Sequence, residues 1–318
     1  MIGVAALAGV AGVGLVAYGM TAEWLFFRRH PPPGHLVDVG GHRLHIQCSG
    51  DGAPAVIFES SLGGSSVDWY AVQPEVSRFT RACAYDRAGA GWSEAAPLPR
   101  DPLRTADDLH TLLAGAGVTP PYVPVGHSYG GYVARVFAQR FRNEVAGLVL
   151  VDIATPAMFQ RAPAIHSQMA QMARDCRWDK LRAVFAISRL RGDSMTYVPP
   201  AIRPIADGFF LSRKFQDDSC GEVQTMLGDG QTQVRQAGSF GALPLVIVTA
   251  GKREYLDEDS WRAWQEIQRE LTALSTRSTQ LFANQSSHHV QFGEPQVVVN
   301  AVRGIVDDIR RAPAAPPR

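Results

Sequence analysis

Short, uninterrupted apolar runs alternate with longer amphipathic stretches along this chain, and that alternation restricts the fold it can adopt. The apolar runs lie at residues 55–59, 82–85, 123–125, 145–151 and 245–249. Continuous apolarity over so few residues is typical of strands that are buried on both faces. Helix-like stretches lie between them, at residues 67–79, 104–114, 129–141 and 260–274. The alternation predicts an α/β fold with a mostly parallel central sheet flanked by helices.

One interval interrupts this rhythm. Residues 155–242 contain no run of the buried-strand type and only helix-like pieces, and the interval is too long to be a connecting loop. We therefore predict a helical cap at residues 155–242, inserted into a core formed by residues 36–154 and 243–311. Residues 312–318 are rich in proline and alanine and are predicted to be a disordered tail.

The N-terminal segment is apolar. Residues 2–22 contain no charged side chain, and as a helix they are long enough to cross a hydrocarbon core of about 30 Å. Aromatic and then basic residues follow, as at a membrane boundary: Trp24, Phe26, Phe27, Arg28 and Arg29. We predict a single-pass transmembrane helix within an anchor at residues 1–27, and a proline-rich linker at residues 28–35. A cleaved signal peptide is the alternative, although the positively charged start of such a peptide is missing.

Charge and cysteine content limit the possible cellular location of the protein and the classes of partner that it can bind. Lysine and arginine number 31 against 30 aspartates and glutamates, so the near-neutral balance excludes the basic footprint of a nucleic-acid-binding protein. Arg28 and Arg29 favour the cytoplasmic side of the membrane for the domain that follows. The four cysteines are scattered without a Cys-x-x-Cys pair, which indicates neither a zinc site nor a dense disulfide framework. We expect buried free thiols, with a Cys176–Cys220 bond as the alternative in an oxidising compartment.

A serine lies at the junction between an apolar run and a helix-like stretch, in the pattern Gly126-x-Ser128-x-Gly130. A sharp strand-to-helix turn strains the backbone of its central residue, and glycines two positions away on either side leave the clearance that the turn needs. Such a turn lifts the serine hydroxyl above the sheet edge. Ser128 is therefore the predicted nucleophile. Because a serine is a poor nucleophile by itself, it needs a histidine base and a carboxylate that orients the base.

Further motifs resemble those of the α/β-hydrolase fold superfamily. Residues 85–93 read YDRAGAGWS, similar to the family's D-x-R-G-x-G-x-S turn. Near the C-terminus, His288 is followed by Gln291 and Pro295 at the spacing of the family's closing pattern. The resemblance extends over residues 36–311 and implies a serine esterase-like or lipase-like member with a helical cap. It also implies that His288 is the base, and we interpret His289 as a packing neighbour.

Two carboxylates compete for the third catalytic position. Most members of the family carry the acid after the strand that follows the insertion, where this chain has Glu254. A minority carry it at the end of the preceding strand, where Asp152 lies. Glu254 belongs to a charge-rich stretch that is typical of a solvated loop. We favour Asp152, because a carboxylate that ends a buried strand is costly without a partner such as an imidazolium.

The oxyanion hole needs two backbone N–H groups aimed at the tetrahedral oxygen. The resemblance assigns one to Tyr129, the residue after the nucleophile. The other comes from the loop after the run at residues 55–59, where Leu62 is our candidate. Ser61 lies where the family usually has a glycine, so this loop departs from the common pattern.

Together these residues predict a serine hydrolase that cleaves a carboxylic ester, or a related acyl bond, of an apolar small molecule through an acyl-enzyme. Two alternatives stay open: an acyltransferase or thioesterase of the same fold, and a catalytically silent binding protein. A serine nucleophile argues against the epoxide hydrolase and haloalkane dehalogenase branches, which use an aspartate there. The chain contains no phosphate-binding loop, dinucleotide fingerprint or metal-ligand spacing, so we expect neither a cofactor nor a metal. The expected partners are the apolar substrate and, through the N-terminal helix, a membrane.

Overall fold

A single sheet organises the domain. In residues 2–97 and 99–311, which the computed structural model describes, eight strands form this sheet in the order β1-β2-β4-β3-β5-β6-β7-β8. Strand β2 runs antiparallel to both of its neighbours, and all the other neighbouring strands pair in parallel. The strands are β1 His35–Asp38, β2 Arg43–Ser49, β3 Ala55–Glu59, β4 Ala82–Tyr85, β5 Tyr122–His127, β6 Leu148–Val151, β7 Leu245–Ala250 and β8 Ser278–Ala283. The predicted fold class, a mostly parallel sheet flanked by helices, is confirmed.

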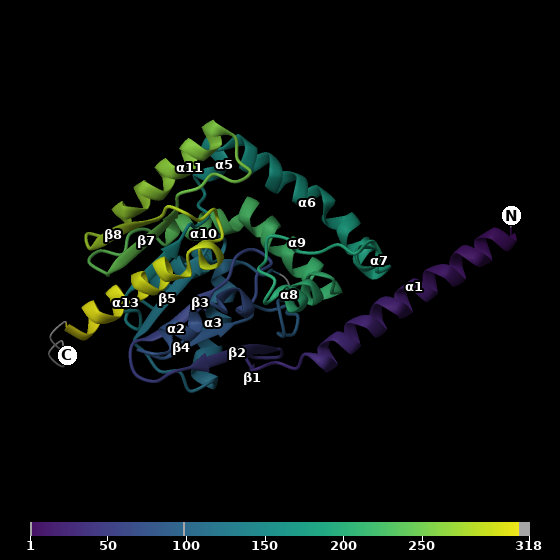
Figure 1. Cartoon of the computed structure of the whole chain (residues 1–318), viewed down its shortest axis with the longest axis horizontal. Coiled ribbons are helices and arrows are strands. Elements are labelled where there is room, and N and C mark those ends of the chain that lie inside the picture. Colours follow the sequence, from purple (N-terminus) through teal and green to yellow (C-terminus); the bar gives the residue numbers. More distant parts are fainter. Residues whose placement is uncertain (1, 98, 312–318) are drawn as a thin grey trace.

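Helices cover both faces of the sheet (Figure 1). One face packs against α3 and α4 in a core that includes Leu109 and Phe137, and the other against α13 in a core that includes Val298 and Val302. The helices around the sheet are η1 Ser66–Trp69, α2 Gln73–Val76, α3 Pro102–Gly115, α4 Gly130–Arg140, α11 Glu258–Glu270, η2 Leu271–Leu274, α12 Val290–Gly293 and α13 Pro295–Arg311.

The prediction of one continuous helix at residues 67–79 is wrong. The segment instead forms η1 and, after a break, the single-turn helix α2. Pro74 lies at the start of α2. Since proline has no backbone N–H and its ring clashes with the preceding turn, a helix cannot run through this position unbroken.

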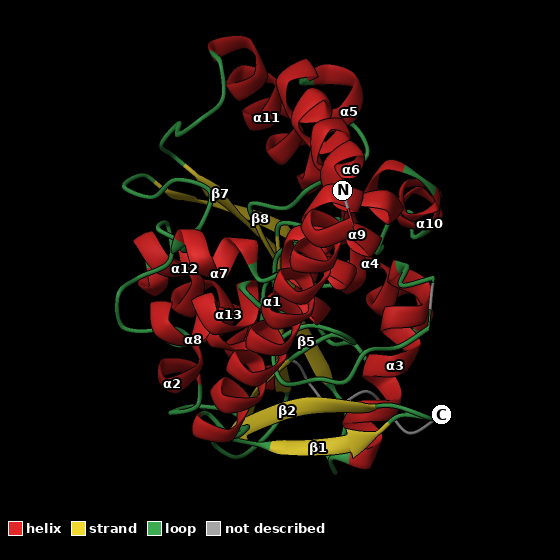
Figure 2. Ribbon diagram, turned by 90° about the vertical axis from the view of Figure 1, so that its right-hand side faces the viewer, coloured by secondary structure: helices red, strands yellow, loops and turns green. Residues whose placement is uncertain are grey.

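Between β6 and β7 all the described elements are helices. They are α5 Met158–Arg161, α6 Pro163–Val184, α7 Ile187–Arg191, α8 Arg203–Phe210, α9 Arg213–Leu227 and α10 Asp229–Gln236. They lie within residues 155–242, the interval predicted to be the cap, and we call them the cap. Figure 2 views the protein from the side on which the cap helices α6 to α9 lie in Figure 1. The tail predicted at residues 312–318 lies outside the described residues.

The N-terminal helix α1, Ile2–Arg29, extends from the domain, and the N-terminus lies at its far end (Figure 1). Its segment Gly9–Arg29 has a mean hydropathy of 1.4 and is not buried in the protein, so length and composition make it a candidate membrane span. The C-terminal end of α1 contacts the cap. The ring of Phe26 lies 5.7 Å from that of Phe209, and Glu23 Oε2 lies 3.6 Å from Arg213 Nε.

Two disulfides correct the expectation of free thiols. Cys48 and Cys83 are bonded to each other, as are Cys176 and Cys220, so no described cysteine is free. Cys48 and Cys83 are paired residues of the antiparallel strands β2 and β4, with their Cα atoms 4.0 Å apart. The Cys176–Cys220 bond links α6 to α9 within the cap. The first pairing depends on strand register, which the spacing of the cysteines does not reveal.

Removing the bond in the cap is expected to destabilise the protein. The double variant Cys176→Ser, Cys220→Ser should lose about 2–4 kcal/mol of unfolding free energy, because an open chain gains more conformational entropy on unfolding. Urea unfolding monitored by circular dichroism measures the loss. As a control, dithiothreitol should lower the stability of the wild type and leave that of the double variant less changed. Reactive thiols in the unreduced, urea-unfolded wild type would contradict the bonds.

Candidate active site

Ser128 occupies a tight turn between β5 and α4. Its φ angle is +52°, a left-handed conformation that is rare for residues other than glycine. The flanking glycines are sterically required. A Cβ atom at Gly126 would lie 2.6 Å from the carbonyl oxygen of Gly130, and one at Gly130 would lie 2.4 Å from that of Glu59. The strained turn thus depends on its two glycines, as the sequence pattern indicates.

His288 lies in the loop after β8 and faces Ser128. Its Nε2 lies 3.0 Å from Ser128 Oγ, and its Nδ1 lies 2.7 Å from Asp152 Oδ2. The side chain of His288 is 20% exposed, whereas that of Asp152 is almost completely buried. The structure therefore brings Ser128, His288 and Asp152 into one hydrogen-bonded series, with the serine end open to a cavity.

Asp152 follows β6 directly and has a positive φ angle of +43°. Its second carboxylate oxygen, Oδ1, accepts hydrogen bonds from the backbone N–H of Ala250 and from Trp264 Nε1, both at 3.0 Å. Both oxygens of this buried carboxylate thus accept hydrogen bonds. These bonds offset the cost of keeping a carboxylate away from water.

Glu254, the alternative acid, lies on the exposed stretch after β7. It lines the same cavity as His288. Within residues 2–97 and 99–311, however, no hydrogen bond or ion pair joins it to that histidine. The structure does not bring Glu254 into the series formed by Ser128, His288 and Asp152.

The two candidate oxyanion donors lie on either side of the serine. Tyr129 follows Ser128 at the start of α4, and Leu62 lies on the loop after β3, where it lines the cavity together with Ser128 and His288. Within the described part of the chain, the backbone N–H groups of Leu62 and Tyr129 have no hydrogen-bond acceptor. Both donors are therefore available to a bound oxygen atom.

A second histidine positions the loop that carries His288, and sequence reasoning missed it. His127 is fully buried, and its Nε2–H donates to the carbonyl of His288 at 2.9 Å. Its Nδ1 accepts from Gln291 Nε2 at 3.1 Å. Burial, and then the nearby charges of His288 and His289, hold the pKa of His127 well below its usual range, so the ring is neutral. Gln291 is part of the closing pattern of the sequence, which could have signalled this contact.

His289 packs as the sequence interpretation supposes. Its ring stacks on Phe292 with centroids 5.6 Å apart, and lies 4.6 Å from the ring of Tyr197. Burial, followed by the charge of His288, lowers the pKa of His289 to about 3. It is therefore uncharged at neutral pH. Trp264, the donor to Asp152, had no recognisable signal in the sequence.

Two cavities meet at Ser128. The smaller, of about 140 Å³, has mainly apolar walls that include Met158, Ile165 and Met226. The larger, of about 810 Å³, extends between the cap helices and includes Arg189 and Phe215. Both are also lined by His288 and Leu62. In the described part of the chain no group of three or more His, Cys, Asp or Glu side chains could hold a metal ion.

Comparison with known proteins agrees with this architecture. The family model described as "alpha/beta hydrolase fold" matches residues 54–177. An "AB hydrolase superfamily protein" of Gibberella zeae is 25% identical over 285 residues, which cover 81% of this chain and 87% of that protein. The "Probable transporter efuK" of Hormonema carpetanum is 28% identical over 302 residues, which cover 86% of this chain but 42% of that longer protein.

Solved structures share the fold at low sequence identity. A loop variant of a haloalkane dehalogenase from Bradyrhizobium elkanii has a TM-score of 0.70 and 17% identity, with 87% of this chain and 96% of that chain covered. A thermophilic esterase from Thermogutta terrifontis has a TM-score of 0.64 and 19% identity, with 86% and 98% covered. Sheet order, the turn at Ser128 and these comparisons lead to one conclusion: the chain has the α/β-hydrolase fold.

Proposed function

We propose that this protein is a serine hydrolase that cleaves a carboxylic ester, or a related acyl bond, of an apolar small molecule. The observation that carries the proposal is the hydrogen-bonded series from Ser128 Oγ through His288 to Asp152, open to a cavity at its serine end. This is the arrangement that a serine needs in order to act as a nucleophile.

In the first half of the reaction, Ser128 Oγ forms a bond to the substrate carbonyl carbon while His288 Nε2 takes the hydroxyl proton. The carbonyl electron pair moves onto oxygen, where the N–H groups of Leu62 and Tyr129 stabilise the negative charge. Asp152 orients the imidazole and stabilises its protonated form. His288 then gives the proton to the leaving alcohol as the carbon–oxygen bond breaks, which leaves the acyl group on Ser128.

In the second half, a water molecule repeats the sequence from the position that the alcohol has left. His288 takes a proton from the water as its oxygen attacks the acyl carbon, and then returns that proton to Ser128 Oγ. The products are a carboxylic acid and the free enzyme. No further group is required for the balance of atoms and electrons.

The cavity walls support an apolar substrate. Beside Ser128, the smaller cavity is lined by side chains that offer contact area but no charge, among them Met158, Ile165, Met169, Met226, Trp261 and Trp264. Its Lys252 and Glu254 follow β7 on an exposed stretch. Such walls suit the hydrocarbon part of an acid or alcohol.

Covalent labelling tests the proposal directly. A fluorophosphonate probe is expected to label the wild type at Ser128 and to leave Ser128→Ala unlabelled, because the probe reacts only with an activated hydroxyl. A panel of p-nitrophenyl esters of increasing chain length should be hydrolysed by the wild type alone. A folded wild type that is neither labelled nor active would overturn the hydrolase proposal and favour the silent binding protein.

Two amide substitutions separate the candidate acids. Asp152→Asn is expected to lower kcat by roughly 10⁴-fold, because an amide cannot stabilise the protonated imidazole in the correct tautomer. Glu254→Gln leaves the three hydrogen-bonded side chains intact, so its kcat should remain near that of the wild type. Steady-state kinetics on one ester measures both. The reverse ranking would move the acid to Glu254.

We also propose that α1 attaches the protein to a membrane. Its segment Gly9–Arg29 is mostly apolar, with charges only at Glu23, Arg28 and Arg29, is long enough to span a bilayer, and is not buried in the protein. Nearby, the cap exposes large apolar side chains at the end of α6 and on α7: Trp178, Leu181, Val184 and Leu190. Gly19 of α1 approaches this region, since a Cβ atom there would lie 3.1 Å from Ala186 Cβ. Membrane contact would give these exposed groups an apolar environment.

The side of the membrane is inferred from two opposing signals. Arg28 and Arg29 favour the cytoplasmic side. The Cys48–Cys83 and Cys176–Cys220 bonds favour an oxidising compartment, because disulfides rarely persist in the cytosol. We give the two disulfides more weight than the two arginines, because both bonds would have to persist against the reducing cytosol. We therefore revise the expectation from the sequence and propose that the domain lies on the non-cytoplasmic side.

Reporter fusions in a bacterial host test the orientation. Alkaline phosphatase, which is active only outside the cytoplasm, is expected to be active when fused after Arg311, and a fluorescent protein that folds in the cytoplasm should stay dark there. The opposite pattern would return the domain to the cytoplasm. Retention of the full-length mass in carbonate-washed membranes would distinguish an anchor from a cleaved signal peptide.

A further inference from the structure

Arg87 lies behind the loop that carries Leu62 and binds two of its carbonyl groups. The side chain is 4% exposed. Its Nη1 donates to the carbonyl of Ser60 at 2.8 Å, and its Nη2 donates to that of Ser61 at 2.6 Å. A planar guanidinium can make such contacts together because its donors have a fixed, forked geometry.

The contact with Ser61 helps to fix where the next N–H points, together with the turn bond that the same carbonyl accepts from the N–H of Gly64 at 2.9 Å. The carbonyl of Ser61 and the N–H of Leu62 belong to one planar peptide unit, and in a trans peptide they point in opposite directions. Since the carbonyl is directed at Arg87, the N–H of Leu62 is directed away from it. Leu62 lines the cavity that Ser128 also lines, whereas Arg87 does not line it.

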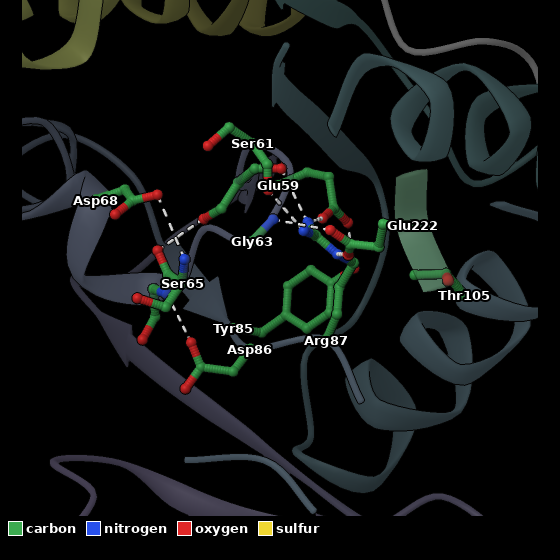
Figure 3. Close-up of polar contacts among 12 residues, drawn as sticks. Glu59, Ser61, Gly63, Ser65, Asp68, Tyr85, Asp86, Arg87, Thr105 and Glu222 are labelled. Carbon is green, nitrogen blue, oxygen red and sulfur yellow. Dashed lines mark hydrogen bonds and ion pairs between the residues drawn. The ribbon is translucent and has the colours of Figure 1, made fainter. Parts of the chain in front are cut away.

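A side chain from the cap completes the arrangement. Glu222 belongs to α9, and its Oε1 accepts from Arg87 Nε at 2.5 Å. Its Oε2 accepts from the backbone N–H of Gly63 at 2.8 Å. Figure 3 shows the carboxylate of Glu222 between Arg87 and Gly63. The loop is therefore held before Leu62 by Arg87 and after it by Glu222.

The fit between the loop and the cap is close. Gly63 has a φ angle of +63°, and a Cβ atom there would lie 2.7 Å from Ser219 Oγ of α9. A larger residue at this position would push the loop away from the cap helix. Glycine therefore allows Glu222 to reach the backbone of the loop.

The charges within this cluster depend on one another. Arg87 also pairs with Glu59, which in turn accepts from the hydroxyl of Tyr85 (Figure 3). Burial alone would lower the pKa of Arg87, but Glu222 and Glu59 outweigh it and raise that pKa well above its usual range. Arg87 is thus a permanent cation, and loss of one carboxylate would leave it with a buried charge only partly compensated.

We propose that Arg87 and Glu222 are positioning residues for the oxyanion hole, through which the cap fixes the direction of the Leu62 N–H. The inference rests on the proposed function. It adds that the contacts of Arg87 and Glu222 hold the Leu62 N–H in the direction that the reaction needs. Neither side chain touches the substrate. Their effect is transmitted through the backbone of the loop.

Glu222→Gln tests the role with little change in shape. Arg87 and Gly63 bind different oxygens of Glu222, and the amide replaces one of these oxygens by an NH2 group that can only donate, so one of the two contacts is lost. We expect kcat to fall by about 10- to 100-fold with KM little changed, since removal of an oxyanion donor costs about 10²–10³-fold. Affinity for a trifluoromethyl ketone, whose adduct carries the oxyanion, should fall by the same factor. Arg87→Lys should act in the same direction, because lysine lacks the fork.

Asp218→Asn is the matched control. Asp218 lies one turn before Glu222 on α9, is 1% exposed, and pairs with Arg100 at 3.2 Å. It therefore perturbs the same helix and the same charge cluster without touching the loop. Its melting temperature is expected to change at least as much as that of Glu222→Gln, while its kcat stays near wild type. Equal losses of kcat in the two variants, or no loss in Glu222→Gln, would overturn the proposal.

Hydrogen exchange gives a readout that does not depend on activity. The N–H of Gly63 should exchange faster in Glu222→Gln than in the wild type and in Asp218→Asn, as measured on the peptide that covers the loop after β3. Unchanged exchange would overturn the positioning role, even if no ester proved to be a substrate. A folded wild type that is neither labelled by the fluorophosphonate probe nor active would instead overturn the hydrolase proposal alone.

Discussion

One buried carboxylate connects the parts of the site. Asp152 follows β6, and its two oxygens accept from His288, from the backbone N–H of Ala250 at the end of β7 and from Trp264 of α11. Three segments far apart in the chain are thus oriented by a single charge. Because burying that charge is costly unless every bond is made, the sheet edge, α11 and the loop after β8 must assemble together.

Two layers of positioning surround the proposed nucleophile. On the side of the base, His127 and Gln291 fix the carbonyl of His288 and leave its ring free to face Ser128. On the side of the oxyanion, Arg87 and Glu222 fix the loop around Leu62. Both layers act on the backbone, which costs less rotamer entropy than holding long, flexible side chains at the reacting atoms.

The features that could be predicted from the sequence are those that depend on a few neighbouring residues. The strands could be predicted because burial on both faces leaves short apolar runs, and the turn at Ser128 because its glycines are sterically required within five residues. Features that depend on tertiary contacts could not be predicted from the sequence. The Cys48–Cys83 bond depends on strand register, and Trp264 and Glu222 come from helices whose local sequence does not mark them. Pro74 was the overlooked local signal, since it breaks the helix predicted at residues 67–79.

Helix α9 is held by a disulfide and by a buried hydrogen bond, and this affects how a substrate reaches Ser128. Cys220 joins this helix to α6, and Glu222 joins it to the loop beneath. A hinged lid would have to give up a buried charge contact each time it opened. Entry through the wider cavity, which lies between the cap helices and already reaches Ser128, avoids that cost. The enzyme would then select substrates by the width of a permanently open cavity. The bulk and branching of the substrate would matter more than the rate at which a lid closes.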